Sequence, residues 1–218
     1  KSLLFQLDAL RCREEVPGSC LVVITPTVAL ALDHERTLSA IPGLERSRAL
    51  TGDLVGQERT ELLDALRRGE IPVLFMSPEL AFGGARDALL EVATPPAAKL
   101  AGLHGHLRAV VIDEAHIVES WGRSFRPDFQ RLPALVGELR AADPSLRIVL
   151  LSATLPTAAR QVLRASYGAL GSWLEIDAGT PRYEFDVVVQ SYERNDERIA
   201  ALDHVIDEHA TEFGRANL

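Results

Sequence analysis

The sequence predicts an α/β fold with a mostly parallel sheet covered by helices on both faces. Four short apolar runs, rich in Val and Ile, have the length of strands, and segments with helical spacing of apolar residues separate them. Continuous apolar runs are typical of strands buried on both faces, and their alternation with helices is typical of a parallel sheet. The expected strands cover residues 21–24, 73–76, 109–112 and 147–151.

The segments between these runs carry apolar residues at helical spacing, which predicts helices there. The expected helices cover residues 2–14, 28–41, 57–68, 86–92, 128–142, 157–167 and 196–213. Residues 94–105 include two prolines and two glycines and predict a loop. Residues 174–176 and 187–189 predict two further strands. We expect one domain over residues 1–195, followed by a helical stretch over residues 196–218 that leads toward a further domain.

The composition is that of an ordinary globular domain, with 47% hydrophobic and 25% charged residues among 218. No apolar run reaches the ~18 residues that span a bilayer. Cys12 and Cys20 are the two cysteines, which supports neither a zinc ribbon nor a disulfide framework, so we expect free thiols in a reducing cytoplasm. Because the chain begins at Lys1 rather than Met, we expect that upstream residues have been removed.

The net charge of −8 argues against a broad basic face for nucleic acid. A protein that holds a strand in a cleft between domains still needs only a local positive surface. Lys1 and Lys99 are the lysines among 23 basic residues, and this arginine bias predicts a GC-rich bacterial genome.

Polar residues follow each expected strand, and ligands of parallel sheets bind at the carboxyl ends of the strands. These residues are Thr25-Pro26-Thr27, Ser77-Pro78-Glu79, Asp113-Glu114-Ala115-His116 and Ser152-Ala153-Thr154. We therefore expect all four segments to meet at one edge of the sheet.

The adjacent acids Asp113 and Glu114 suit phosphoryl transfer, in which one carboxylate holds Mg²⁺ and the next orients and deprotonates water. A solvated turn that caps a helix is the alternative, but the apolar strand before the pair and the Ala-His after it favour the catalytic interpretation. Lys1-Ser2 matches the last two letters of the phosphate-loop pattern G-x-x-x-x-G-K-[ST], in which Lys reaches the phosphates of ATP and Ser binds Mg²⁺. An arbitrary chain end is the alternative there.

Residues 121–127 combine two aromatic and two arginine side chains in a turn-rich segment just after the acidic pair. Aromatic rings stack on bases and arginine binds phosphate, so Trp121, Phe125 and Arg126 are candidates for holding a nucleic-acid strand. The alternative is that the rings fill the core and the arginines are solvated. For Ser152 and Thr154 the choice is between bonds to the acidic segment or phosphate and an ordinary helix cap.

In this order, the segments resemble the first motor domain of superfamily 2 helicases, and the resemblance covers nearly the whole chain. Lys1-Ser2 resembles the end of motif I, Thr25-Pro26-Thr27 motif Ia, Ser77-Pro78-Glu79-Leu80 motif Ib, Asp113-Glu114-Ala115-His116 motif II in its DEAH form, and Ser152-Ala153-Thr154 motif III. The resemblance implies a RecA-like P-loop NTPase fold, a three-layer sandwich. It also implies a second RecA-like domain in the same full-length chain, which supplies an arginine to the ATP site.

Residues 113–127 resemble the acidic box and aromatic-rich loop of RecQ helicases through the Trp-Gly and Phe-Arg-Pro pairs and the following Phe129. The chain differs from that family at residues 117–119, at Arg123-Ser124 and at Thr27, which indicates a divergent member. The resemblance implies an ATP-dependent DNA helicase that moves 3′ to 5′ on a single strand or fork, with a loop that couples the strand to ATP turnover.

The resemblance also implies a role for each candidate residue. Lys1 neutralises phosphate charge, Ser2 and Asp113 hold Mg²⁺, and Glu114 activates water. His116, Ser152 and Thr154 link the nucleotide to the nucleic-acid surface, which is formed by Thr25, Pro26, Ser77, Pro78, Trp121, Phe125 and Arg126. Three alternatives stay open: an RNA helicase, a double-strand translocase, and a scaffold that binds nucleic acid without hydrolysing ATP.

Overall fold

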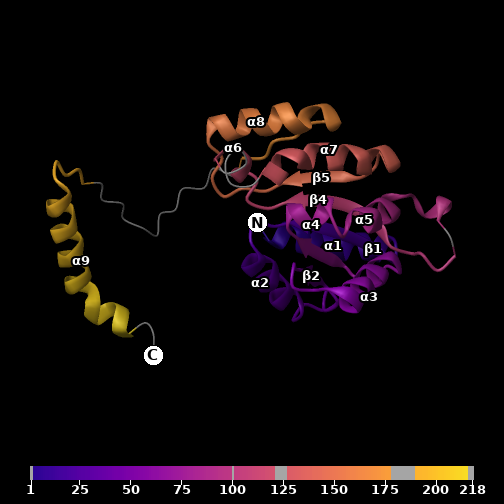
Figure 1. Cartoon of the computed structure of the whole chain (residues 1–218), viewed down its shortest axis with the longest axis horizontal. Coiled ribbons are helices and arrows are strands. Elements are labelled where there is room, and N and C mark those ends of the chain that lie inside the picture. The colour runs from indigo at the N-terminus through magenta and orange to yellow at the C-terminus, as the bar shows by residue number, and fades with distance from the viewer. Residues whose placement is uncertain (1, 100, 121–126, 178–189, 216–218) are drawn as a thin grey trace. The chain divides into compact units, whose positions relative to one another are not determined.

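The computed structural model describes residues 2–99, 101–120, 127–177 and 190–215, and it divides the chain into two compact units (Figure 1). The first unit, Lys1–Leu174, contains the sheet. The second, Glu175–Leu218, contains the helix α9 (Asn195–Arg215). Among the described residues, no helix is both long and apolar enough to cross a membrane.

The sheet of the first unit has five strands in the order β2-β3-β1-β4-β5, and every neighbouring pair is parallel. The strands are β1 (Ser19–Ile24), β2 (Arg48–Leu50), β3 (Val73–Met76), β4 (His106–Ile112) and β5 (Arg147–Leu150). The predicted α/β fold with a mostly parallel sheet is confirmed. Strand β2 was not predicted, because three residues beside a polar turn give too short a pattern.

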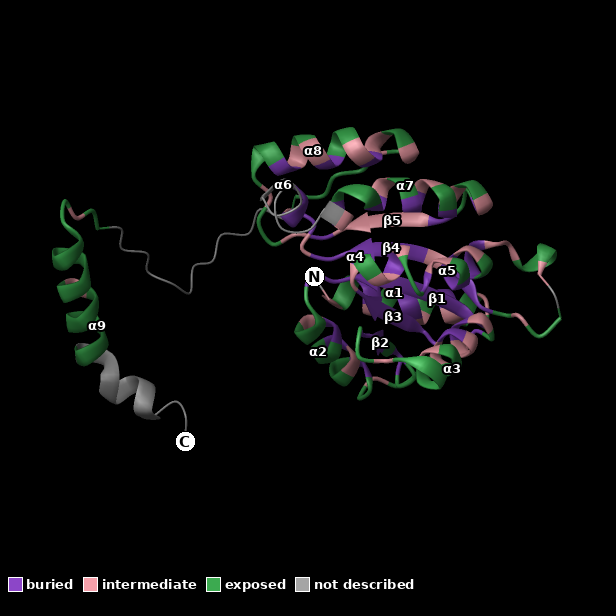
Figure 2. Ribbon diagram, viewed as in Figure 1, coloured by how far each residue is buried: buried purple, intermediate pink, exposed green. Residues whose placement is uncertain are grey.

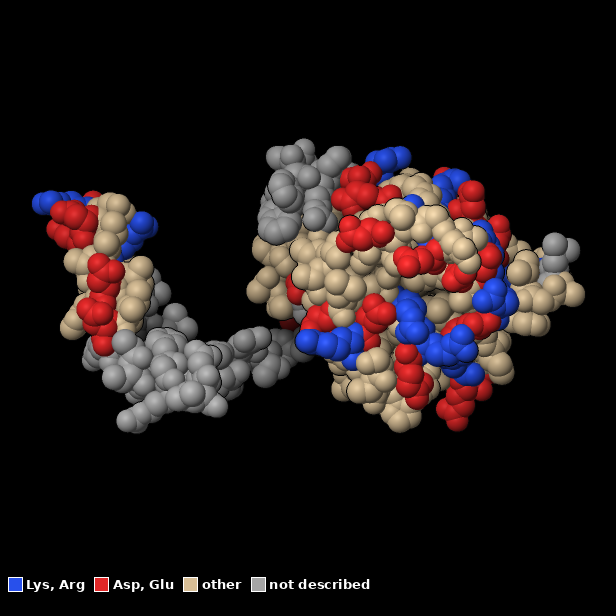
Figure 3. Space-filling view, turned by 60° about the horizontal axis from the view of Figure 1, so that its bottom comes forward, with Lys and Arg blue, Asp and Glu red and all other residues tan. Residues whose placement is uncertain are grey.

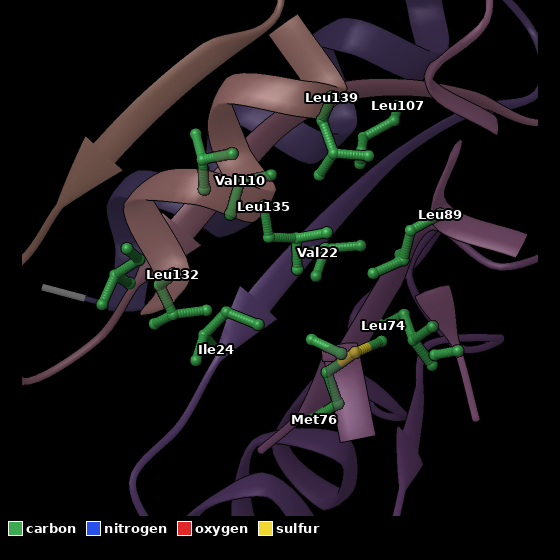
Figure 4. Packing of buried hydrophobic residues seen from close by; sticks show 14 of the residues in the cluster. Val22, Ile24, Leu74, Met76, Leu89, Leu107, Val110, Leu132, Leu135 and Leu139 are labelled. Atoms are coloured by element: carbon green, nitrogen blue, oxygen red, sulfur yellow. The ribbon is translucent and has the colours of Figure 1, made fainter. Parts of the chain in front are cut away.

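Side chains of the central strands alternate between two hydrophobic cores, as the period of a strand requires. In β1, Val22 and Ile24 enter one core, and Leu21 and Val23 enter the other. Figure 4 shows the first core, in which side chains from the strands meet Leu89 and three leucines of one helix. The central strands β1, β3 and β4 are mostly buried, the edge strand β5 is half-buried, and the outer helix faces are exposed (Figure 2). The first unit is therefore a three-layer sandwich.

The two helical layers differ in size. Helices α1 (Ser2–Glu15) and α2 (Val28–Leu38) contribute to the smaller core. The larger core takes residues from α3 (Gly56–Arg67), α4 (Pro78–Phe82), α5 (Arg86–Ala93), α6 (Ile117–Ser120), α7 (Pro127–Ala142) and α8 (Thr157–Tyr167). Two single turns of 3-10 helix, Pro96–Ala98 and Gly168–Leu170, complete the first unit's described helices.

The predicted strand over residues 174–176 is wrong. Leu174 and Ile176 are 82% and 83% exposed, and the chain is irregular there. An apolar triplet becomes a strand only where a neighbouring strand accepts its hydrogen bonds, and none of the described strands does so. The other predicted strand, residues 187–189, lies outside the described residues.

A buried pair of ionisable side chains lies at the amino end of strand β4. His106 Nε2 at the start of β4 lies 3.0 Å from Asp143 Oδ2, which follows α7. Burial raises the pKa of Asp143, but hydrogen bonds from Ser145 and His106 and the charge of His106 outweigh burial and lower this pKa overall. The folded state therefore binds a proton at Asp143 less readily than the unfolded chain does.

We expect this pair to make the fold less stable in acid. A lowered carboxyl pKa stabilises the fold above the unfolded pKa of about 3.9, and this stability is lost as the pH falls through the folded value. Asp143→Asn should lower the melting temperature near pH 7 yet show a shallower loss between about pH 4 and pH 2. Melting temperatures across this range test the expectation, and equal slopes in the two proteins would contradict it.

Candidate functional site

The carboxyl ends of four strands are level with one another. Ile24 of β1 is in register with Met76 of β3 and with Ile112 of β4, which is in turn in register with Leu150 of β5. The ladder continues one residue further, since the Asp113 N–H donates to the Ile24 carbonyl over 2.9 Å. The four polar segments therefore begin at one edge of the sheet, as the sequence predicts.

The Asp113 carboxylate is buried at this edge, with 5% of the residue exposed. Its Oδ1 accepts a hydrogen bond of 2.9 Å from the Glu114 N–H, and its Oδ2 lies 3.5 Å from Nε2 of His34 on α2. The backbone hydrogen bond holds one carboxylate oxygen, and the imidazole lies beside the other. The sequence did not identify His34, which was predicted only as part of a helix.

Glu114 has a left-handed backbone, with φ of 50°. Residues other than Gly and Asn rarely adopt this backbone conformation. It raises the free energy of the folded chain by on the order of 1–3 kcal/mol where the surroundings impose it. The next residue supplies the constraint, because the Ala115 N–H donates to the Leu151 carbonyl over 2.8 Å and holds the turn against the end of β5. The Glu114 side chain is 28% exposed, so solvent reaches it.

His116 joins the acidic segment to the segment after β5. Its Nδ1 lies 3.0 Å from Ser152 Oγ and 3.3 Å from Glu114 Oε2. The Ser152 hydroxyl donates its single proton to the Thr154 carbonyl, so its oxygen is left to accept from His116. We therefore assign the proton of a neutral His116 to Nδ1, which leaves Nε2 as an acceptor. The hydroxyl of Ser152 thus bonds to the acidic segment rather than capping a helix.

The other two polar segments form helix starts. The Thr27 hydroxyl accepts from the Leu30 N–H over 3.2 Å and caps α2, and Ser77 precedes Pro78 in the first turn of α4. Thr25, Pro26 and Pro78 are buried, whereas Thr27 is exposed and Ser77 is half-buried. Because Thr25 and Pro26 are buried as whole residues, Thr27 is the exposed residue of this segment.

Ser2 begins α1 and is half-buried. Phe5, Ala9 and Cys12 anchor this helix on the sheet, so the position of Ser2 is fixed by a packed helix. The remaining candidates, Lys1, Trp121, Phe125 and Arg126, lie outside the described residues.

The oxygen donors of this edge fit magnesium. Among the described residues, no group of three or more His, Cys, Asp or Glu side chains could hold a metal ion by itself. Mg²⁺ does not require such a group, because it keeps several waters and binds one or two protein oxygens together with substrate phosphates. The Asp113 carboxylate at this edge is a donor of that kind, and the Ser2 hydroxyl at the start of α1 is another.

Most arginines on the described surface are paired with acids. Such pairs include Arg36 with Asp33, Arg46 with Glu70, and Arg86 with Glu138. The face drawn in Figure 3 accordingly shows basic and acidic side chains next to one another instead of one broad basic patch. The charge pattern of this face agrees with the expectation that any nucleic-acid contact is local.

Comparison with known proteins identifies the family. The family model of the DEAD/DEAH box helicases matches residues 1–162. Two solved helicase structures have the same fold: the DUF1998 helicase MrfA bound to DNA (TM-score 0.58, 17% identity, 77% of this chain and 22% of that one) and the Pyrococcus furiosus Hef helicase domain (TM-score 0.52, 18% identity, 77% and 30%). The fold is RecA-like, and the chain belongs to the DEAD/DEAH box helicase family.

Within this family, the chain is similar to RecQ-type helicases. It is 34% identical over 168 residues to the ATP-dependent DNA helicase Q-like 5 of Arabidopsis thaliana, covering 76% of this chain and 16% of that protein. It is 32% identical over 161 residues to the ATP-dependent DNA helicase RecQ of Pasteurella multocida, covering 74% and 22%. The RecQ resemblance predicted from the sequence is confirmed. The chain spans less than a quarter of the length of these two relatives.

Proposed function

We propose that the chain is the first motor domain of an ATP-dependent DNA helicase, which couples ATP hydrolysis to translocation and strand separation. The observation that carries this proposal is the pair of contacts of His116 Nδ1, 3.3 Å from Glu114 Oε2 and 3.0 Å from Ser152 Oγ, at the sheet edge where Asp113 also lies. This link joins a water-activating acid to the segment after the next strand of the sheet. Such an arrangement suits a motor better than a passive scaffold.

The chemistry of the site follows from its donors. ATP would supply the phosphoryl group that is transferred, and Mg²⁺ would supply the positive charge that neutralises the phosphates. Asp113 and Ser2 would bind the metal ion, and Lys1 would neutralise phosphate charge. Glu114, which solvent reaches, would orient the attacking water and accept its proton. The Nδ1 proton of His116, which lies near both Glu114 Oε2 and Ser152 Oγ, would couple a change of charge on Glu114 to the position of the Ser152-Thr154 segment.

The nucleic-acid surface in this proposal begins at Thr25-Pro26 and Ser77-Pro78 and includes Trp121, Phe125 and Arg126. We propose single-stranded DNA or a fork as the substrate and 3′-to-5′ movement, with support from the similarity to RecQ-type DNA helicases. A second RecA-like domain in the full-length chain would close the ATP site. We place this activity in the cytoplasm.

The choice of substrate separates the proposal from its alternatives. The full-length protein should hydrolyse ATP fastest with single-stranded DNA, compared at equal nucleotide concentration with duplex DNA and with RNA. Faster turnover with duplex DNA or RNA would favour the double-strand translocase or the RNA helicase. Binding of all three without turnover would favour the scaffold.

The loop over residues 121–127 should couple DNA to ATP turnover. Trp121→Ala and Arg126→Ala are expected to leave the melting temperature and basal ATPase nearly unchanged and to abolish stimulation by single-stranded DNA, because stacking and phosphate binding are both lost. A thermal melt and an ATPase titration measure both effects. If Trp121 fills the core instead, Trp121→Ala destabilises the domain by roughly 3–5 kcal/mol and stimulation survives.

A further inference from the structure

His34 on α2 is a buried polar side chain at the site edge that belongs to none of the four polar segments. It is 7% exposed. Its ring stacks on Phe75 of β3, with centroids 5.3 Å apart and planes at 21°, and meets the edge of Phe5 on α1 at 5.4 Å and 88°. Two aromatic contacts on different elements hold the imidazole in one orientation.

In that orientation, His34 Nε2 lies beside the Asp113 carboxylate. The distance from Nε2 to Oδ2 is 3.5 Å, and both side chains are less than 10% exposed. Nε2 has no hydrogen-bond partner of good geometry among the described residues, although the Asp113 carboxylate is within ion-pair distance. A buried ring nitrogen without a partner is costly, and a small rotation of the carboxylate would complete this bond.

The position of His34 also connects the two parts of the proposed site. Helix α2 begins after the Thr27 cap, seven residues before His34, which is about 10 Å along a helix. Its start carries the Thr25-Pro26 segment of the proposed nucleic-acid surface. Phe5, which contacts the ring, lies one turn after Ser2 on α1. A displacement of α2 would therefore move the ring that contacts both Asp113 and, through Phe5, the helix that begins at Ser2.

We propose that His34 is a positioning residue, which orients the Asp113 carboxylate for Mg²⁺ and links that carboxylate to the start of α2. The inference rests on the proposed function, because it assigns His34 a part in the same metal site. Partners that orient a metal-binding side chain typically contribute 10–100-fold to metal affinity or activity. His34 acts through Asp113 and does not itself touch the nucleotide.

Two substitutions separate hydrogen bonding from packing. His34→Gln keeps a donor that reaches toward Asp113, whereas His34→Leu keeps apolar volume between the two phenylalanines and removes the donor. Arg36→Gln, on the exposed face of α2, is the control. In the full-length protein, His34→Leu should raise the Mg²⁺ concentration for half-maximal ATP binding by roughly 10-fold or more. His34→Gln and Arg36→Gln should stay within about threefold of the wild type.

A wild-type Mg²⁺ requirement in folded His34→Leu would overturn the proposal. If His34→Leu does not fold, His34→Gln decides, because a Mg²⁺ requirement raised as far as 10-fold despite the retained donor would equally overturn it. If the wild-type protein shows no Mg²⁺-dependent ATP binding, the proposed function fails by itself.

A nitrogen NMR measurement then tests the inference without nucleotide. In protein with ¹⁵N-labelled histidine, Asp113→Asn should shift the His34 Nε2 resonance more than those of the other histidines, because it changes the group that Nε2 faces. An unchanged His34 resonance would overturn the inference independently of ATP binding.

Discussion

The 218-residue chain by itself is expected to hydrolyse ATP at least about 10³-fold more slowly than the full-length protein with its proposed second RecA-like domain. Glu114 and His116 are 28% and 30% exposed, so both side chains are accessible to a group from another domain. A cation stabilises the negative charge of the phosphoryl group in the transition state. An arginine supplied from another domain for this purpose is worth roughly 10³–10⁵ in rate in related phosphoryl-transfer enzymes. Steady-state ATPase assays of both proteins, with saturating single-stranded DNA, measure the difference.

Slow ATP hydrolysis by the 218-residue chain could also result from a failure to fold, so its folding has to be measured. The first unit has its own two hydrophobic cores, so the short chain should give a cooperative thermal transition. If the short, folded chain turned over ATP as fast as the full-length protein, the site would be complete without a second domain. The proposed two-domain motor would then be wrong.

Glu114→Gln in the full-length protein should reduce ATP turnover by roughly 10² or more while ATP binding stays close to that of the wild type. The amide keeps the shape and the reach of the side chain, but it cannot accept the proton of the attacking water. Single-turnover hydrolysis and equilibrium binding of ATP separate the two steps. Normal turnover in Glu114→Gln would assign water activation to another residue.

Asp113→Asn is the matched comparison for Glu114→Gln. The substitution Glu114→Gln removes a base, whereas Asp113→Asn removes a negative charge that would hold Mg²⁺. Asp113→Asn should therefore weaken the Mg²⁺-dependent part of ATP binding. The two substitutions are equal in size and adjacent in the chain. The same loss of binding in both variants would contradict the division of labour between the two acids.

The sequence predicted the sandwich and the sheet edge because both depend on local patterns. Apolar runs mark buried strands, and the residue after each run lies at the carboxyl edge whatever the details of packing. Register then brought the segments after Ile24, Met76, Ile112 and Leu150 together. The order of strands was not predicted, since pairing joins runs that are far apart in the chain.

The contacts that tune the site depend on tertiary structure. His34 faces Asp113 across 79 positions of sequence (113 − 34), and only the packing of α2 on β3 places it there. The left-handed backbone of Glu114 has no sequence signal, because glycine or asparagine usually marks such a position. Arg147 on β5 similarly pairs with Asp8 on α1 at 2.6 Å, across 139 positions. Contacts between single residues that are far apart in the chain leave no repeating pattern in the sequence, so they could not be predicted from it.

Strand separation tests the helicase proposal most directly. The full-length protein should separate a short DNA duplex with a 3′ single-stranded tail when ATP and Mg²⁺ are present, and should leave the duplex intact with a non-hydrolysable ATP analogue. Glu114→Gln, which is expected to bind ATP but to hydrolyse it slowly, should separate strands at least about 10²-fold more slowly. An intact duplex under all conditions, or equal separation by the wild type and Glu114→Gln, would contradict the account.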